Sequence, residues 1–169
     1  NPILAKQGVE VLSSEILRLS SIRPMSATDI ANIVALGGQS GIAKEQLMQF
    51  ADSAVKMGVA FDISAQQAGQ SMAELRSAFQ LDQKGVETLA DKINYLGNTT
   101  PAAAKSIMEI VQRVGAFGEV AGYSTGTVAV LGASMKGFGI AEEVAATSIK
   151  NMMLSLVAGE TATKGQISA

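Results

Sequence analysis

Apolar residues recur three and four positions apart along almost the whole chain, the spacing of residues on one face of an α-helix. No alternation of apolar and polar residues of strand length stands between turn signals. The pattern predicts an all-α fold, an array of about seven or eight short amphipathic helices packed as antiparallel pairs, with few or no strands. The stripes run through Val9–Leu19, Ile30–Val34, Leu47–Val55, Ala68–Phe79, Val86–Leu96, Ala104–Val114, Val128–Met135 and Val144–Leu156.

Polar residues that suit helix N-caps precede most of these stripes. Ser64 and Gln67 have the spacing of a capping box, in which each side chain accepts a hydrogen bond from the other residue's backbone N–H. Ser26 and Asp29 form an acidic variant of the same box. The other predicted N-caps are Asp82, Ser124 and Thr100, the last followed by Pro101 at the first helical position.

Proline and glycine predict where the helices end. Pro24 disfavours a helical conformation in Arg23 and so predicts the end of the first helix. Glycine adopts a left-handed conformation readily, and it is predicted to end other helices at Gly37–Gly38, Gly58, Gly97, Gly115 and Gly159. These breaks predict an N-terminal helix over residues 1–23 that leads in from a longer parent chain, a helical core module over residues 24–159 and a frayed polar tail over residues 160–169.

The composition narrows the chemistry that the chain can carry. There is no His and no Cys among the 169 residues, which removes imidazole bases, thiolate nucleophiles, disulfides and nearly every transition-metal site. The formal net charge of −2 gives no basic footprint for a nucleic acid, so no direct nucleic-acid binding is expected from this segment. We therefore expect a non-enzymatic interaction scaffold with no catalytic, cofactor-binding or metal site.

Two features could be mistaken for chemistry. Glu142 and Glu143 are adjacent in a predicted first helical turn, where they point about 100° apart and favour compensation of the helix dipole over acid–base work. The glycines near the last helix follow no predicted strand, so a phosphate-binding loop is not indicated. Helix ends and close helix contacts explain them better; they include Gly132, Gly137 and Gly139.

The eight methionines are interpreted in two ways, as core packing and as additional apolar surface. Met72, Met135 and Met152 fall inside helical stripes, where core packing is expected. Met108 and Met153 extend their stripes sideways, and we interpret them as widening the apolar face beyond what one partner helix covers. Surplus apolar surface of this kind predicts assembly with another protein.

The segment from Val120 to Ile140 is weakly polar and rich in glycine, with Lys136 as its only positive charge. No stretch of the chain reaches the roughly 18 to 20 uninterrupted apolar residues of a spanning helix. The sequence therefore predicts no membrane-spanning helix, but the weak polarity of this segment leaves contact with a membrane, in another state of the protein, as an open alternative.

From Arg23 to about Leu156 the order of features resembles the N-terminal helical core of phage tail tape measure proteins, of the contractile-tailed phage type. These are packing and capping patterns, and their order and spacing carry the resemblance. The matching stretches are residues 24–30, 37–42, 50–52, 58–64, 68–72, 93–98 and 111–115.

The resemblance implies a structural component of a phage tail. It implies that the parent chain lies inside the tail tube of the virion after assembly in the host cytoplasm, takes part in tail assembly and length determination, and leaves at genome ejection. The implied partners are other copies of itself and tail tube, tail assembly chaperone or baseplate hub proteins; which residues bind them is unknown.

A rod that measures length should be one long helix, whereas glycine and proline interrupt this segment every ten to twenty residues or so. The pattern therefore indicates a jointed module that docks or rearranges. Two alternatives stay open: a generic helical adaptor whose methionine-rich face binds a partner helix, and a membrane-active segment released at infection.

Overall fold

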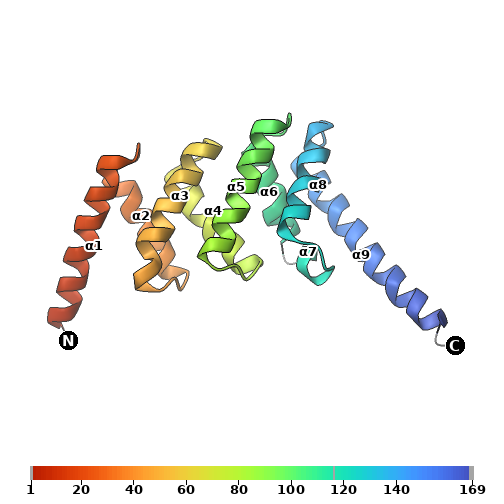
Figure 1. Cartoon of the computed structure of the whole chain (residues 1–169), viewed down its shortest axis with the longest axis horizontal. Coiled ribbons are helices and arrows are strands. Elements are labelled where there is room, and N and C mark those ends of the chain that lie inside the picture. Colours follow the sequence, from red (N-terminus) through yellow and green to blue (C-terminus); the bar gives the residue numbers. More distant parts are fainter. Residues whose placement is uncertain (1, 116, 168–169) are drawn as a thin grey trace. The chain divides into compact units, whose positions relative to one another are not determined.

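The computed structural model describes the backbone of residues 2–115 and 117–167 and the side chains of residues 8–115, 117, 118 and 120–159. Within these residues the chain forms helices and no strand, which confirms the predicted all-α fold (Figure 1). The helices are α1 (Pro2–Ile22), α2 (Ala27–Gln39), the 3-10 helix η1 (Lys44–Gln46), α3 (Leu47–Phe61), α4 (Ala65–Ala78), α5 (Gln83–Thr99), α6 (Ala104–Val114), α7 (Phe117–Val120), α8 (Thr125–Gly137) and α9 (Glu142–Ile167).

The helices group into two compact units. Unit 1 contains the residues up to Arg76 together with Asp82–Glu87, and unit 2 contains Ser77–Leu81 together with the residues from Thr88 onward. The boundary therefore passes through α5, whose first residues belong to unit 1 and whose remainder belongs to unit 2. The sequence-based boundaries at residues 23 and 159 stay predictions.

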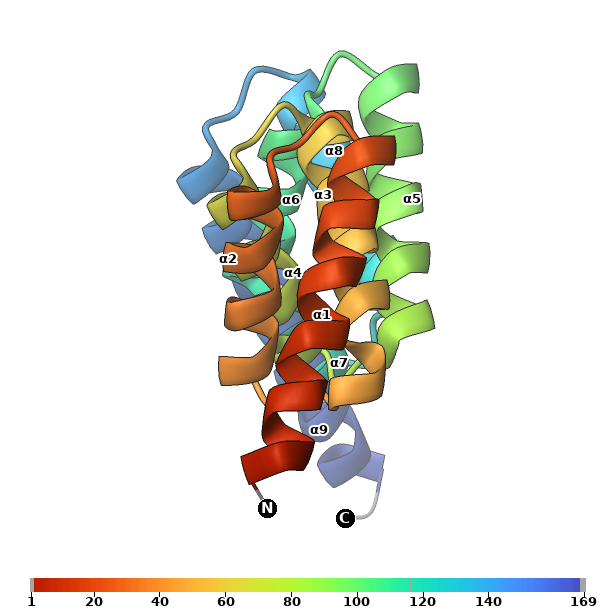
Figure 2. The ribbon, with the colours of Figure 1, turned by 90° about the vertical axis from the view of Figure 1, so that its left-hand side faces the viewer.

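Unit 1 is built around α2 and α3. In Figure 2, α1 and α2 lie side by side and run in opposite directions, and α1 and α2 both contact α3. Their apolar stripes meet in a core, because burying such a face is the main stabilising effect available to an amphipathic helix. The fully buried side chains of this core include Ile30, Ile33, Phe50, Val55, Met72 and Leu75.

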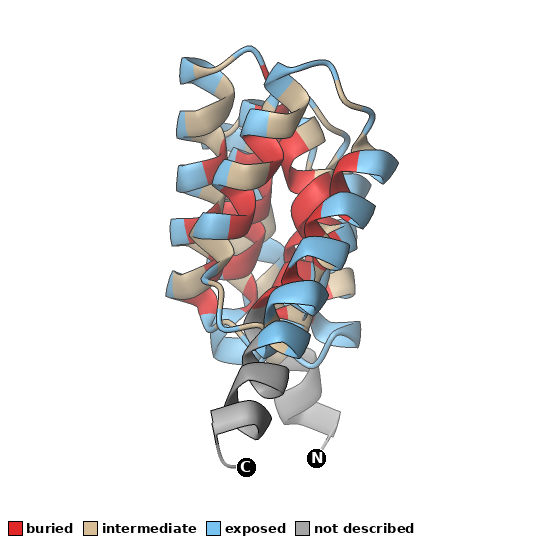
Figure 3. Cartoon of the chain, turned by 90° about the vertical axis from the view of Figure 1, so that its right-hand side faces the viewer, coloured by how far each residue is buried: buried red, intermediate tan, exposed pale blue. Residues whose placement is uncertain are grey.

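Unit 2 has α6 at its centre, in contact with both α8 and α9. In Figure 3 the buried residues line the inner sides of the helices while exposed residues cover the outer sides. Gly132 of α8 lies so close to α6 that an added Cβ would stand 3.1 Å from Ile110 Cγ2, which confirms the predicted close helix contact there. The other large buried side chains of this unit include Leu89, Ile93, Ile107, Ile149 and Met153.

Most of the predicted N-caps are confirmed by hydrogen bonds. Ser64 Oγ accepts from Gln67 N, and Gln67 Oε1 accepts from Ser64 N, both at 3.2 Å, which completes the capping box. The remaining confirmed caps are Ser26 with Asp29 N, Asp82 with Gly85 N, and Ser124 with Thr127 N.

The predicted end of a helix at Gly58 is wrong. Gly58 is a buried residue inside α3, where an added Cβ would stand 3.4 Å from Ala68 Cβ. The helix continues to Phe61, and the left-handed position that follows is taken by Asp62, with φ of 53°. A Cβ at Gly58 would therefore make only ordinary contacts, and the glycine neither ends the helix nor is required for the approach of α4.

The ends predicted at Gly37–Gly38 and Gly97 are also displaced. Helix α2 runs on to Gln39, because Gly37 faces the core with Phe50 and Leu47 beside it. Helix α5 runs on to Thr99. In both places the glycine lies within the helix, and its missing side chain leaves space for a residue from outside that helix. The end predicted at Gly115, by contrast, is confirmed, with φ of 54°.

The start predicted at Thr100–Pro101 is wrong. Helix α6 begins at Ala104, after an extended Ala103 that makes no side-chain cap. The Thr100 hydroxyl instead donates to Leu96 O at 2.8 Å and accepts from Ala102 N at 3.3 Å, so it completes the end of α5 and the turn after it.

Further differences concern the helices and the methionines. The short helices η1 and α7 were not predicted, and α9 continues past Gly159 to Ile167. Met72 is buried as predicted, whereas Met152 is 40% exposed. Met108 and Met153, interpreted as surplus surface, are only 3% and 1% exposed, because their helices are covered on more than one side. That interpretation was wrong, and the surplus apolar surface lies on other residues.

Within the described residues, no helix has both the length and the apolar character needed to cross a membrane. The segment from Val120 to Ile140 consists of the end of α7, a turn, α8 and the turn before α9.

Candidate interaction surfaces

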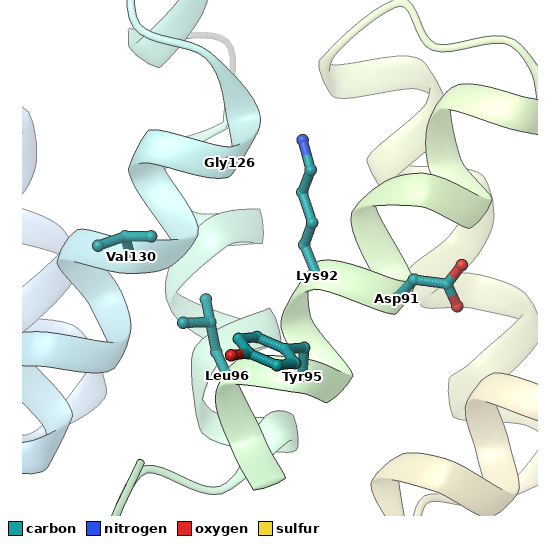
Figure 4. Close-up of a pocket in the computed structure, with 6 residues that line it drawn as sticks. All are labelled: Asp91, Lys92, Tyr95, Leu96, Gly126 and Val130. Carbon is teal, nitrogen blue, oxygen red and sulfur yellow. The ribbon is translucent and has the colours of Figure 1, made fainter. Parts of the chain in front are cut away.

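A groove lies between α5 and α8 of unit 2, and we call it the α5–α8 groove (Figure 4). Its volume is about 470 Å³. Tyr95 and Leu96 reach it from α5, and Val130 and Gly126 reach it from α8. Tyr95 is 68% exposed and Val130 is 51% exposed, so the groove offers water a large aromatic ring and a branched aliphatic side chain.

The rim of the α5–α8 groove carries one charge of each sign, Asp91 and Lys92. The Lys92 side chain extends toward the start of α8, where its Nζ would stand 3.4 Å from a Cβ placed on Gly126. Asp91 points away from α8 (Figure 4). An apolar floor with a polar rim is the composition of a protein-binding surface, in which the rim fixes orientation and the floor supplies the affinity.

A second exposed apolar position is Phe138, in the turn between α8 and α9. Its side chain is 85% exposed. The backbone N–H of Phe138 donates to Ser134 O and Met135 O, both at 3.2 Å, and Gly139 follows with φ of 77°. The turn is therefore held by backbone hydrogen bonds while the ring faces solvent, which is the presentation expected of an aromatic anchor.

The first turn of α9 carries the two adjacent glutamates, and each has an ion pair. Glu142 Oε1 lies 2.9 Å from Lys136 Nζ, and Glu143 Oε1 lies 3.1 Å from Arg113 Nη2. Hydrogen bonds from Lys136, the Ser106 hydroxyl and the backbone N–H of Glu142 lower the pKa of Glu142 from 4.5 to about 2. Both residues stand in the first turn of the helix, as the dipole interpretation requires.

Unit 1 contains a hydrogen-bonded polar network between α3 and the start of α5. Glu87 Oε1 accepts from Ser53 Oγ at 2.6 Å, Gln83 Nε2 at 2.9 Å and Gln49 Nε2 at 3.2 Å. Arg76 Nη1 donates to Gln83 Oε1 at 2.7 Å. Burial alone would raise the pKa of Glu87, but these hydrogen bonds together lower it below the ordinary value. The network connects α5 to α3.

The described residues contain no group of three or more carboxylates placed to hold a metal ion. The expected absence of catalytic, cofactor-binding and metal sites stays a prediction. Sequence reasoning left the partner-binding residues unknown, and it singled out neither Tyr95 nor Phe138. A hint was available, because each is a large aromatic residue in a chain with only 4% aromatics.

Comparisons with known proteins place the chain in a family. The chain belongs to the family described as "Phage-related minor tail protein", which matches residues 13–169. It is 36% identical over 167 residues to the "Probable tape measure protein" of Halomonas phage phiHAP-1 (isolate -/Gulf of Mexico/-/2001). That alignment covers 94% of this chain and 19% of the relative's length, so the chain spans about a fifth of this curated relative. No solved structure matches the chain.

These comparisons confirm the resemblance to tape measure proteins that the order of sequence features indicated. They support a structural role in a phage tail, and with it a place in the virion among other tail components.

Proposed function

We propose that this chain is a docking module of a tape measure protein, and that it binds another tail component through the α5–α8 groove. The observation that carries the proposal is the exposure of Tyr95 and Val130 around an apolar groove in a tail protein. Exposed aromatic rings beside an apolar depression are the usual centre of a protein interface. The module itself performs no catalysis.

The proposed place of the parent chain is the lumen of the tail tube, after assembly in the host cytoplasm. There it takes part in tail length determination and leaves at genome ejection. The groove binds a tail tube, tail assembly chaperone or baseplate hub protein, or another copy of the chain. Family membership supports this proposal, and the relative's printed name connects it with length measurement.

The same proposal assigns the length-measuring part to another segment of the parent. A ruler made of one continuous helix would change tail length by about 1.5 Å for each residue removed. This chain is instead divided into helices joined by turns, and its contacts form two compact units. We therefore expect deletion of one helical hairpin here to reduce the number of tails without shortening those that form.

The binding experiment uses the purified chain with each candidate tail protein from the same phage, and light scattering gives the mass of the complex. Tyr95→Ser and Val130→Ser are expected to abolish a complex that the unaltered chain forms. Val59→Ser is the matched control, because Val59 is an exposed valine of α3 outside the groove. Equal loss of binding in the control, or retained binding in both groove variants, would argue against the groove.

The purified chain and the groove variants also distinguish the two alternative functions from a docking module. A generic helical adaptor would bind through the groove but leave tail number unchanged when the groove is altered in the phage. A membrane-active segment would permeabilise liposomes made of phosphatidylethanolamine and phosphatidylglycerol. Tail length measured by electron microscopy decides the ruler question, since shortening in proportion to the deletion would contradict the docking module.

A further inference from the structure

Unit 1 has a pocket of its own, between the end of α1 and the start of α3. Its volume is about 280 Å³. We call it the arginine pocket, because Arg18 and Arg23 both line it. The other lining residues are Leu19, Ile22, Met48, Gln49 and Asp52.

The charges in the arginine pocket are unequal. Arg23 Nε lies 2.7 Å and its Nη2 3.2 Å from the two carboxylate oxygens of Asp52, a two-point contact that satisfies this carboxylate from one side. Lys56 Nζ also lies 2.7 Å from Asp52 Oδ2. Arg18 has no hydrogen bond or ion pair from its side chain within the described residues. Among the lining residues, two guanidinium groups against one carboxylate leave an excess of one positive charge.

The excess charge stands beside an apolar surface. Leu19 forms a buried floor at 3% exposure, and Ile22 stands exposed beside it. Met48 is half-buried and adds a flexible thioether side chain. Burial alone would raise the pKa of Asp52, but hydrogen bonds from Arg23 and Lys56 lower it below its ordinary value. An acidic group with an apolar neighbour complements this combination.

We propose that the arginine pocket binds a carboxylate side chain from an acidic segment of a partner protein, with an apolar side chain of that segment packed on Leu19 and Met48. Arg18 supplies the unused guanidinium, whose planar fork matches a carboxylate at two points. Charge complementarity carries this assignment. The pocket belongs to unit 1, so the proposal stands whether or not the α5–α8 groove has the function given above.

The test uses a capped leucine–glutamate dipeptide as the probe and the leucine–glutamine dipeptide as its neutral counterpart. Each is titrated into the ¹⁵N-labelled chain, and the side-chain Nε–H signals of Arg18 and Arg23 are followed by NMR. The glutamate probe is expected to shift both signals, less so at high salt because the attraction is screened. The glutamine probe is expected to leave them in place.

Substitutions then separate the pocket from a general charge effect. Arg18→Glu is expected to weaken binding of the glutamate probe by up to about fivefold, given the size of a single exposed ion-pair interaction. Lys105→Glu makes the same change of charge at an exposed position of unit 2 and is expected to leave the affinity unchanged. Asp52→Asn removes the internal competitor for Arg23 and is expected to raise the affinity by roughly two- to fivefold.

The gain expected from Asp52→Asn protects the test from misfolding, because an unfolded variant would not bind more tightly. Equal binding of the two dipeptides, or equal weakening by Arg18→Glu and Lys105→Glu, would overturn the proposal. If sodium acetate shifted the Arg18 and Arg23 signals as much as the glutamate probe does, the assignment to a peptide segment would be overturned, since acetate has no apolar neighbour.

Discussion

Gly97 shows how one missing methyl group sets the path of the chain. A Cβ at this position would stand 2.7 Å from Ala104 Cβ and 2.8 Å from Ala104 N, so the turn after α5 passes directly over the glycine. Such distances are shorter than any comfortable contact between non-bonded atoms. The close approach places Ala104, the first residue of α6, directly against α5.

We expect Gly97→Ala to lower the free energy of unfolding by about 1 to 3 kcal/mol, because the added methyl group overlaps backbone atoms that must move. Gly38→Ala is the control, since nothing stands within 4 Å of a Cβ there and Gly38 lies inside α2. The control is expected to stabilise by up to about 1 kcal/mol through helix propensity. Urea unfolding followed by circular dichroism measures both, and a stable Gly97→Ala would show that the turn can relax.

Gln80 adopts a left-handed conformation, with φ of 48°, in the turn after α4. A residue with a Cβ is strained there by about 1 to 2 kcal/mol, whereas glycine is not. Gln80→Gly is therefore expected to raise the free energy of unfolding by about 0.5 to 1 kcal/mol after the larger entropy of glycine in the unfolded chain is subtracted. Gln80→Ala keeps the strain and serves as the comparison; equal stability of the two variants would contradict the backbone argument.

At the scale of the helices, most starts were predictable from the sequence, whereas most of the ends predicted at glycines were displaced. A cap such as Ser64 with Gln67 is complete within four residues, so the local pattern contains the whole interaction. A glycine has two roles that the local pattern does not separate, a left-handed helix end as at Gly115 or space for a neighbouring side chain as at Gly37. Only the position of the other helix decides between them.

The polar network of α3 and α5 gives an element-scale prediction. Ser53 Oγ, 2.6 Å from Glu87 Oε1 and 3.1 Å from Gln83 Nε2, connects the two helices in a nearly buried place. Ser53→Ala leaves those groups with one partner fewer, and we expect a loss of about 1 to 2 kcal/mol in unfolding free energy. Ser13→Ala is the control, because the Ser13 hydroxyl is exposed and bonds only within its own helix. A similar small effect in both variants would mean that water replaces the lost contact.

For the whole molecule, the carboxylates predict sensitivity to acid. The pKa of Glu142 is lowered from 4.5 to about 2, so the folded chain binds fewer protons than the unfolded chain between these values. Its contribution to stability is complete above about pH 4.5 and is lost as the pH falls toward about 2. The lowered pKa values of Asp52 and Glu87 act in the same direction.

We therefore expect Glu142→Gln to lose less stability than the unaltered chain between about pH 4.5 and pH 2, in thermal unfolding followed by circular dichroism. Glu143→Gln removes a more exposed partner of Arg113, at 66% exposure, and is expected to leave the pH dependence closer to that of the unaltered chain. Parallel curves for the unaltered chain and Glu142→Gln across this range would contradict the assigned shift.

The candidate surfaces were the least predictable part of the molecule. The α5–α8 groove combines Tyr95 and Leu96 with Val130, residues of two helices whose pairing no local pattern reveals. Met153 shows the reverse case, since its place beside the apolar stripe suggested surface and the packing of α9 buries it. Family membership was predictable because the order and spacing of caps, glycines and stripes along the chain carried the resemblance, even where the role of a single residue was misread.

The passage of α5 from unit 1 to unit 2 has a consequence for how the protein opens. In a helix the amides that follow Glu87 bond to carbonyls that precede Thr88, so the backbone ladder continues across the boundary between the units. Neither unit can unfold completely without fraying this shared helix. Amide hydrogen exchange in the middle of α5 is therefore expected to be governed by the less stable unit, and a destabilising change in either one to speed exchange at residues that belong to the other.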